Sequence, residues 1–511
     1  MQLLDFPELV RLRRAKLRPK TLLLLGLGTG MVLGGLLFFL YLGMMADNRN
    51  TVQEMLKVYF IVNLLILLIV NGLYALSLAA QSIAQEREQN TYDFQRLAAA
   101  GPWRLALGKL LGAPCEAWFI LLCALPFLMI SVIGGGVSGS VLLQCLAGLV
   151  VFQLFISSLG LACSALVARS QQSLGLAIVM VGVIHSVLGA LGGGSGVNLW
   201  NAALPWVPAY RLLGDTRFGL YSGAGLSFFG LNALPPILGF LAVNLLLAIF
   251  FLVIAVRRLT DEELPLLSVR QAMVVFLVFE VLLVGSLPCS FAAGWMQRFH
   301  AANLALLAAL AFLMMPTSEQ LRSRMYRGRR DEHWRILFER PQSLEDSPPL
   351  LAFGGLCFAY VLFGGLVTVL EGGQSLFWAA PTLLMVAGFG LAVCALLTVL
   401  QLYFSKSGLK AGALLLVLAL GLPPIALAIT GEERLIMWVN PVGYLIEQAQ
   451  MVEHIPMPIQ HVGAVYSGPA VSLWACPAIC MVLAVMLSLL AAMRLRFLLD
   501  MREEERRKEA A

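Results

Sequence analysis

A short charged stretch separates two long apolar runs of the chain. Residues 82–112 have the sequence SIAQEREQNTYDFQRLAAAGPWRLALGKLLG. Its charged side chains are Glu86, Arg87, Glu88, Asp93 and Arg96, and its larger apolar ones are Tyr92, Phe94 and Leu97. Charges that orient a partner, beside apolar anchors that become buried, are typical of a protein-docking surface. The sequence predicts a short helix over 85–96 that Gly101-Pro102 ends. The alternative is a solvated loop held by local pairs such as Arg87–Glu88.

Two carboxylates lie inside apolar runs. Glu116 and Glu280 are each about ten residues into a predicted span, and a rise of about 1.5 Å per helical residue puts them near mid-membrane. An ionisable group at that depth is costly and is a candidate for a substrate or proton pathway. The alternatives are a protonated carboxyl or a bridge to a polar side chain on another helix. Candidate partners are Asn63, Asn71, Gln144, Gln153, His185, Asn244 and Gln401.

The sequence contains no convincing motif of an enzyme active site. The nearest look-alike of a phosphate-binding loop contains Gly101, Gly108 and Lys109, but its glycines are too far apart. Leu110 also stands where Ser or Thr must hold magnesium. The five histidines and nine cysteines are scattered without metal-ligand spacing. We therefore expect no catalytic residue, metal or cofactor in this chain.

The composition is that of a membrane protein. Of the 511 residues, 59% are hydrophobic and only 13% are charged, with a mean hydropathy of +0.85. Lipid leaves no water for backbone groups, so the apolar runs favour an all-α polytopic fold over barrel strands. We expect about 12 transmembrane helices, near 21–43, 58–80, 106–133, 141–168, 173–191, 233–256, 271–292, 301–316, 350–371, 375–403, 409–430 and 471–496.

The distribution of basic residues predicts the orientation. With these spans, most of the 35 Lys and Arg residues fall on the side of the two termini. Positive residues stay cytoplasmic, so we expect both termini inside a cell membrane, most simply the bacterial cytoplasmic membrane. Residues 1–20 are charged and lack a cleavage site, which indicates a retained cytoplasmic lead-in. The net charge of +6 is then a topology signal, and we expect contact with membrane lipids but none with nucleic acid.

The predicted spans divide into two parallel six-helix repeats. The first half would cover 21–256 and the second 271–496, joined by a cytoplasmic linker at 257–270 and followed by a charged cytoplasmic tail at 497–511. In each half the longest cytoplasmic loop follows the second span, at 81–105 and 317–349. A long external segment with proline follows each fifth span. A parallel repeat is a common way to build a central pathway. The alternative is that any twelve-span chain can be halved.

The stretch EREQNTYDFQRLAAAGPWRLALGKLLG resembles the loop between spans two and three of ABC-2 type ABC exporter permeases. The matching residues are Glu86, Arg87, Glu88, Thr91, Leu97, Pro102, Gly108 and Lys109. The basic amphipathic N-terminus and the proline-bearing external segments also resemble parts of that family, the latter its re-entrant helices. The resemblance covers the first half by motif and the second half by layout only.

This resemblance implies the membrane subunit of an exporter whose ATPase is a separate chain, most simply in two copies. The loop at 81–109 would be the coupling element. The residues implied in coupling are Glu86, Arg87, Glu88, Thr91, Tyr92, Asp93, Phe94, Arg96, Leu97 and Pro102. The second-half loop lacks the motif and offers Arg327, Arg329, Arg330, Trp334 and Arg335 for a second ATPase contact. The alternative for these basic residues is anchoring on anionic lipid.

Two other functions remain open at this point. One is an ATP-independent secondary transporter that uses Glu116 and Glu280. The other, a membrane enzyme, is weaker because no catalytic cluster is visible. The transported substrate is not indicated by the sequence.

Overall fold

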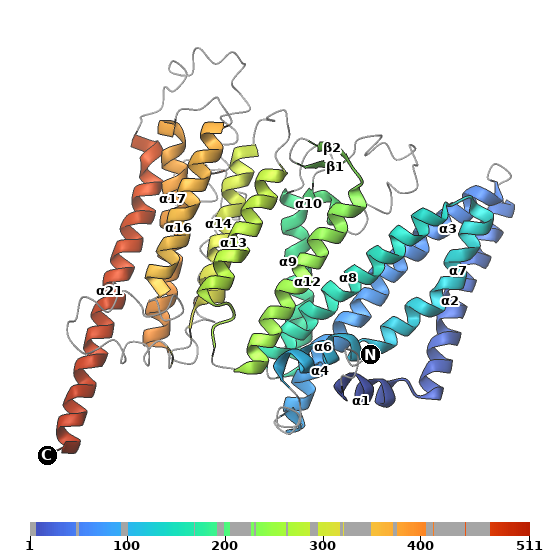
Figure 1. The fold of residues 1–511 in the computed structure, drawn as a ribbon, viewed down its shortest axis with the longest axis horizontal. Coiled ribbons are helices and arrows are strands. Elements are labelled where there is room, and N and C mark those ends of the chain that lie inside the picture. Colours follow the sequence, from blue (N-terminus) through green and yellow to red (C-terminus); the bar gives the residue numbers. More distant parts are fainter. Residues whose placement is uncertain are drawn as a thin grey trace, which may run out of the picture. The chain divides into compact units, whose positions relative to one another are not determined.

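The computed structural model describes residues 7–46, 51–92, 101–167, 169–191, 199–204, 226–228, 231–261, 264–286, 295–316, 320, 349–370, 376–404, 412, 445 and 471–510. The chain divides into two compact units, Met1–Glu262 and Glu263–Ala511 (Figure 1). The boundary lies within 257–270. Each unit is described by itself below.

The first unit is built from helices and one short pair of strands. Its elements are α1 (Pro7–Lys16), α2 (Pro19–Ala46), α3 (Val52–Ile66), the π-helical turn η2 (Leu67–Asn71), α4 (Gly72–Glu88), α6 (Pro102–Gly112), α7 (Cys115–Gly135), α8 (Gly139–Leu166), α9 (Ser170–Leu191), α10 (Leu199–Ala202), β1 (Leu226–Phe228), β2 (Leu231–Leu234) and α12 (Pro236–Thr260). The two strands pair antiparallel.

In its described residues, the second unit consists of long helices. These are α13 (Val269–Gly285), α14 (Trp295–Met314), α16 (Pro349–Leu370), α17 (Leu376–Tyr403) and α21 (Val471–Ala510). The predicted tail at 497–511 is helical as far as Ala510, because α21 continues beyond its apolar part. Within α21, the Arg494 guanidinium lies over the ring of Tyr403, the last residue of α17, 4.5 Å from the ring centroid.

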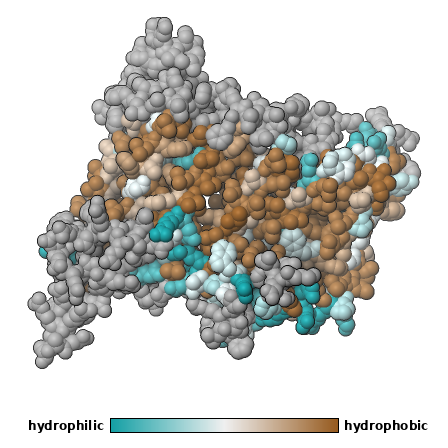
Figure 2. Space-filling view, viewed as in Figure 1, coloured by the Kyte–Doolittle hydropathy of each residue, from teal (hydrophilic) through white to brown (hydrophobic). Residues whose placement is uncertain are grey.

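Within the described residues, nine helices are long and apolar enough to cross a membrane. They are Pro19–Met44, Val52–Glu88, Cys115–Gly135, Gly139–Leu166, Ser170–Gly189, Pro236–Thr260, Leu350–Thr368, Ala380–Tyr403 and Cys476–Leu498. Figure 2 shows apolar side chains over much of the surface of the described helices. The chain is therefore a helical, multi-pass membrane protein.

Local sequence explains where several of these helices begin. Thr51 and Glu54 form a capping box that starts α3, and Ser268 and Gln271 form another at α13. Each box satisfies two backbone amides that a helix start leaves without a partner. At the other end of α7, Gly136 takes a left-handed conformation with φ of 68°, which ends that helix.

Most predicted spans coincide with helices in the described residues, and the span at 271–292 does so as far as Gly285, because 287–292 lie outside the described residues. The span at 409–430 lies outside the described residues apart from Gly412. The prediction of one span over 106–133 was wrong, because the chain turns at Ala113–Pro114 and divides into α6 and α7. Proline cannot donate the helical hydrogen bond and restricts the residue before it. The membrane-length helix therefore starts at Cys115.

Helix α4 lies in the interior of the first unit, packed on α8 and α9. Gly160 of α8 faces the α4 backbone so closely that an added Cβ would lie 2.9 Å from the carbonyl oxygen of Leu76. The Ser164 hydroxyl accepts hydrogen bonds from the amides of Ile83 and Ala84, both at 2.9 Å. From α9, the Ser173 hydroxyl donates to the Ala80 carbonyl at 2.7 Å. These contacts fix the end of α4 that leads into the charged stretch.

Candidate functional site

The charged stretch begins as the last turn of α4. The helix ends at Glu88, and Asn90 adopts a left-handed conformation with φ of 56°. The Thr91 amide and hydroxyl both donate to the Glu86 carbonyl, at 2.9 and 3.3 Å. The prediction of a continuous helix over 85–96 was therefore wrong, because these bonds turn the chain away from the helix axis. Among the predicted coupling residues, Asp93, Phe94, Arg96 and Leu97 lie outside the described residues.

The Gly101-Pro102 pair starts a helix, α6. Pro102 occupies the first turn of α6, where its missing N–H costs nothing. Gly101, just before it, has φ of 114°, a conformation that favours glycine. The residues that the predicted stop would end, 93–100, lie outside the described residues, so the role of this pair as a helix stop stays a prediction. Pro102, one of the predicted coupling residues, is the first residue of α6.

Helix α1 lies directly on α6, and two glycines make this close approach possible. A Cβ added at Gly108 would lie 2.9 Å from the Glu8 Cβ, and one at Gly112 would lie 3.0 Å from the Leu12 Cδ1. Small residues spaced by four positions put a flat strip on one helix face, against which a second helix can pack. The basic lead-in of the sequence is thus a helix held against the start of the membrane domain.

We expect Gly108→Ala to destabilise the first unit by about 1 kcal/mol net. Overpacking typically costs about 1–3 kcal/mol, and alanine regains up to about 1 kcal/mol of helix propensity. The control is Gly175→Ala on α9, where no atom lies within 4 Å of an added Cβ. That control should be neutral or stabilising. Thermal unfolding of the purified full chain measures both, and equal midpoints for the two variants would contradict the close α1–α6 contact.

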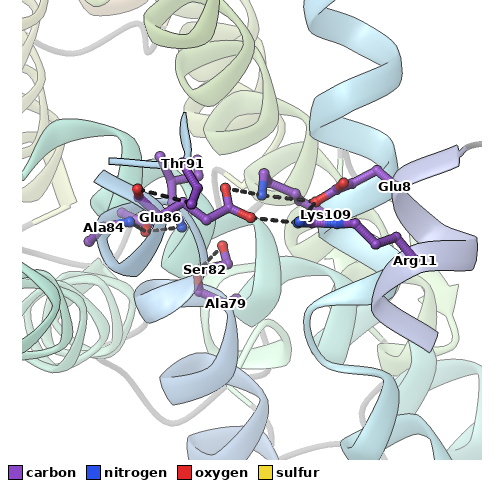
Figure 3. Close-up of polar contacts among 10 residues, drawn as sticks. Glu8, Arg11, Ala79, Ser82, Ala84, Glu86, Thr91 and Lys109 are labelled. Atoms are coloured by element: carbon purple, nitrogen blue, oxygen red, sulfur yellow. Dashed lines mark hydrogen bonds and ion pairs between the residues drawn. The ribbon is translucent and has the colours of Figure 1, made fainter. Parts of the chain in front are cut away.

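Four charged side chains meet between α1, α4 and α6, and we call them the basal cluster. Lys109 Nζ lies 2.5 Å from Glu86 Oε2 and 3.0 Å from Glu8 Oε1. Arg11 Nη2 lies 2.7 Å from Glu86 Oε1 and 2.8 Å from Glu8 Oε1. Figure 3 shows the four side chains converging from the three helices. Two cations therefore balance two carboxylates in an alternating ring.

The basal cluster is largely removed from water. The Lys109 side chain is fully buried, those of Glu8 and Glu86 are 11% exposed, and only Arg11 is half exposed. At low dielectric a charge is tolerated only with close partners, and each of the buried charges here has two or more. The cluster therefore ties α1, α4 and α6 together at one polar end of the first unit.

The next two motif residues contact other helices of the same unit. Arg87 donates to the Ala165 carbonyl of α8 at 3.1 Å, and its guanidinium lies 5.1 Å from the ring centroid of Tyr92. Glu88 accepts from the backbone amide of Ser170 at 2.9 Å, at the start of α9. A carboxylate is favourable at a helix N-terminus because the amides there carry partial positive charge. Each charge of the E-R-E motif thus links α4 to a different neighbour.

These contacts cover part of the motif. Glu86 and Tyr92 are buried, and Glu86 contacts charged side chains of α1 and α6. Sequence reasoning missed Glu8 and Arg11 as members of the site. The one available signal was Lys109, since a cation inside an apolar run requires carboxylates from elsewhere in the fold.

Glu116 does not lie in the middle of a span, as the sequence suggested. It is the second residue of α7, half-buried beside the polar end, and it accepts a hydrogen bond from the Tyr74 hydroxyl. Lys16 of α1 is nearby and donates to the Ala113 carbonyl at 2.7 Å. Burial lowers the pKa of Lys16, and the charge of Glu116 opposes that lowering. The prediction of mid-membrane depth was wrong because the chain breaks at Pro114.

Glu280 does lie in a fully buried position, on α13 of the second unit. The second-half residues predicted to contact an ATPase, which are Arg327, Arg329, Arg330, Trp334 and Arg335, lie outside the described residues. Across the part of the chain that the structure describes, no three His, Cys, Asp or Glu side chains gather as metal ligands would.

No family model, no curated protein and no solved structure matches this chain.

Proposed function

We propose that this chain is the transmembrane subunit of an ATP-binding-cassette exporter of the ABC-2 type. The supporting observation is the basal cluster, which joins the motif residue Glu86 to α1 and α6 at the end of long apolar helices. The E-R-E-x-x-T pattern, which resembles the family's coupling loop, thus begins at a helix end that ion pairs hold to α1 and α6. The ATPase would be a separate subunit, most simply in two copies, that binds the loop over 81–109.

The helices suggest how such a loop would transmit movement. From Val52 to Glu88 the chain is helical without interruption, through α3, η2 and α4. A displacement at the Glu88 end would therefore move a membrane-length rod. The π-helical turn η2 is a natural point for a change of register, and its Asn71 donates to Gln153 of α8 at 3.1 Å. Coupling would consist of tilting this rod against α8.

The wider proposal keeps the predicted architecture. It comprises about twelve spans in two parallel repeats, 21–256 and 271–496, with both termini cytoplasmic in a bacterial cytoplasmic membrane and the substrate crossing between the halves. The second-half loop over 317–349 would contact the second ATPase copy. A secondary transporter is the competing proposal, and its one supporting observation is the buried Glu280. Glu116, at the first turn of α7, no longer supports it.

The decisive experiment is co-purification with an ATPase. The tagged chain is expressed with its genomic neighbours, purified in mild detergent, and assayed by mass spectrometry and for ATP hydrolysis. Phe94→Ala/Leu97→Ala removes the predicted apolar anchors of the loop. We expect this double variant to lose most of the bound ATPase, because buried apolar anchors supply most of the energy of an interface.

The matched control is Phe38→Ala/Leu42→Ala on α2, where the same residue types are 58% and 47% exposed. That variant should keep its ATPase. A wild-type chain that purifies alone and stimulates no ATP hydrolysis would overturn the exporter proposal. Equal loss in the two variants would instead indicate a general defect and refute the loop as the docking element.

A further inference from the structure

A cluster of buried polar side chains lies inside the second unit, where the surroundings are apolar. It comprises Glu280 of α13, His300 and Asn303 of α14, and Tyr360 of α16. Glu280, Asn303 and Tyr360 have no exposed surface, and His300 is 4% exposed. We call these four residues the unit 2 polar cluster. Polar groups this deeply buried are expected to have hydrogen-bond partners, so each group can be accounted for in turn.

The hydrogen bonds leave one part of the cluster incomplete. His300 Nδ1 and the Tyr360 hydroxyl are 2.7 Å apart and satisfy each other. The Asn303 amide donates to the Phe299 carbonyl at 3.2 Å. Among the described residues, both Glu280 carboxyl oxygens and the Asn303 Oδ1 have no hydrogen-bond partner. All three atoms are acceptors when Glu280 is ionised, and among these side chains only the second N–H of the Asn303 amide remains as a donor for them.

No described cation is paired with Glu280. The arginines on α13 and α14, Arg270 and Arg298, are exposed, while Glu280 is fully buried. The titratable groups on the helices packed against α13 are His300 on α14 and Tyr360 and Cys357 on α16. His300 and Tyr360 are bonded to each other, and a tyrosine or cysteine supplies no positive charge. An ionised Glu280 would be an unpaired charge in an apolar core, which is strongly unfavourable.

We propose that Glu280 is a proton-binding site whose carboxyl holds one proton in the folded protein. A proton on either oxygen removes the charge and turns an acceptor into a donor. The unpartnered Asn303 Oδ1, on the adjoining helix α14, is an acceptor for this hydrogen bond. One proton therefore removes the unpaired charge and adds a donor without a further ligand. This assignment is independent of the proposed exporter function.

The site links proton binding to helix packing. Release of the proton would leave a carboxylate between α13, α14 and α16, and the charge could be stabilised only by water or by a cation. Either would require the three helices to move apart, because Glu280 and Asn303 have no solvent access in this structure. Proton binding and the closed packing of these helices therefore favour each other.

Infrared spectroscopy of the purified full chain tests the protonation state directly. Protonated carboxyls and carboxylates absorb at different frequencies, and Glu280→Gln removes only the carboxyl of this residue. At neutral pH the variant should lack a protonated-carboxyl band that the wild type has. Loss of a carboxylate band instead would overturn the proposal. Glu116→Gln, at the half-buried first turn of α7, is the comparison variant, and its difference spectrum locates the signal of a carboxyl near the polar end.

The pH dependence of thermal unfolding gives a second readout. A folded state that keeps a proton lost on unfolding becomes less stable as pH rises. The wild-type unfolding midpoint should therefore fall, relative to that of Glu280→Gln, as the pH rises above about 4.3, where an unfolded Glu loses its proton. Glutamine keeps the neutral form and the acceptor at this position, so the variant should fold. Parallel pH profiles for the two proteins would contradict a bound proton.

Discussion

Lys109→Met is expected to lower the free energy of unfolding of the first unit by about 3–5 kcal/mol, the cost typical of removing one partner of a buried ion pair. The substitution leaves Glu8 and Glu86 facing each other, with the half-exposed Arg11 as the other cation of the basal cluster. Methionine has similar length, so the loss would not come from a cavity. We expect α1 to separate from α6, and thermal unfolding of the purified chain would measure the change.

A companion variant shows whether charge is the cause. Glu86→Gln/Lys109→Met removes one charge of each sign and should recover a large part of the lost stability. Arg11→Gln is the matched control, because it deletes a cation of the same cluster whose side chain is 49% exposed. Exposed pairs are worth at most about 1 kcal/mol, so this control should be mild. Equal losses for Lys109→Met and Arg11→Gln, or no recovery in the double variant, would show that an unpaired buried charge is not the cause of the loss.

Helix existence could be predicted from the sequence, but helix interruption could not. Long apolar runs in lipid have to be helical, and most predicted spans are helices. Prolines within those runs gave no reliable sign of a break. Pro126 and Pro381 remain inside α7 and α17, whereas Pro114 separates α6 from α7. Gly112, two residues before Pro114, lies against α1, a contact that the local sequence does not show.

The candidate site could be located from the sequence, but not its geometry. The clustered charges and the E-R-E motif indicated the C-terminal end of α4, where Glu86 belongs to the basal cluster. The partners of Lys109 could not be inferred, because Glu8 lies 101 positions away along the chain and no periodicity connects the two. Glu86 was expected to face a partner, yet α1 covers it. When the helix that covers a charged residue comes from a distant part of the chain, the local sequence does not distinguish a buried charge from one that contacts a partner.

Gly160→Leu is expected to separate α8 from α4 and to cost at least about 3 kcal/mol, at the upper end of typical overpacking. An added Cβ would lie 2.9 Å from the Ala79 Cβ and the Leu76 carbonyl oxygen, and 3.0 Å from the Ala80 amide nitrogen. Two of these atoms belong to the backbone of α4, so no side-chain rotation relieves the clash. The separation would also break the hydrogen bonds that two α4 amides donate to the Ser164 hydroxyl.

The matched control for this prediction is Gly175→Leu on α9, since no atom lies within 4 Å of a Cβ at Gly175. It adds the same side chain to a glycine with free space, so its unfolding midpoint should stay near that of the wild type. If Gly160→Leu unfolds at the same temperature as this control, α4 is not clamped by α8. The proposed movement of the rod over Val52–Glu88 would then have no fixed surface to tilt against, because that surface is the face of α8 around Gly160.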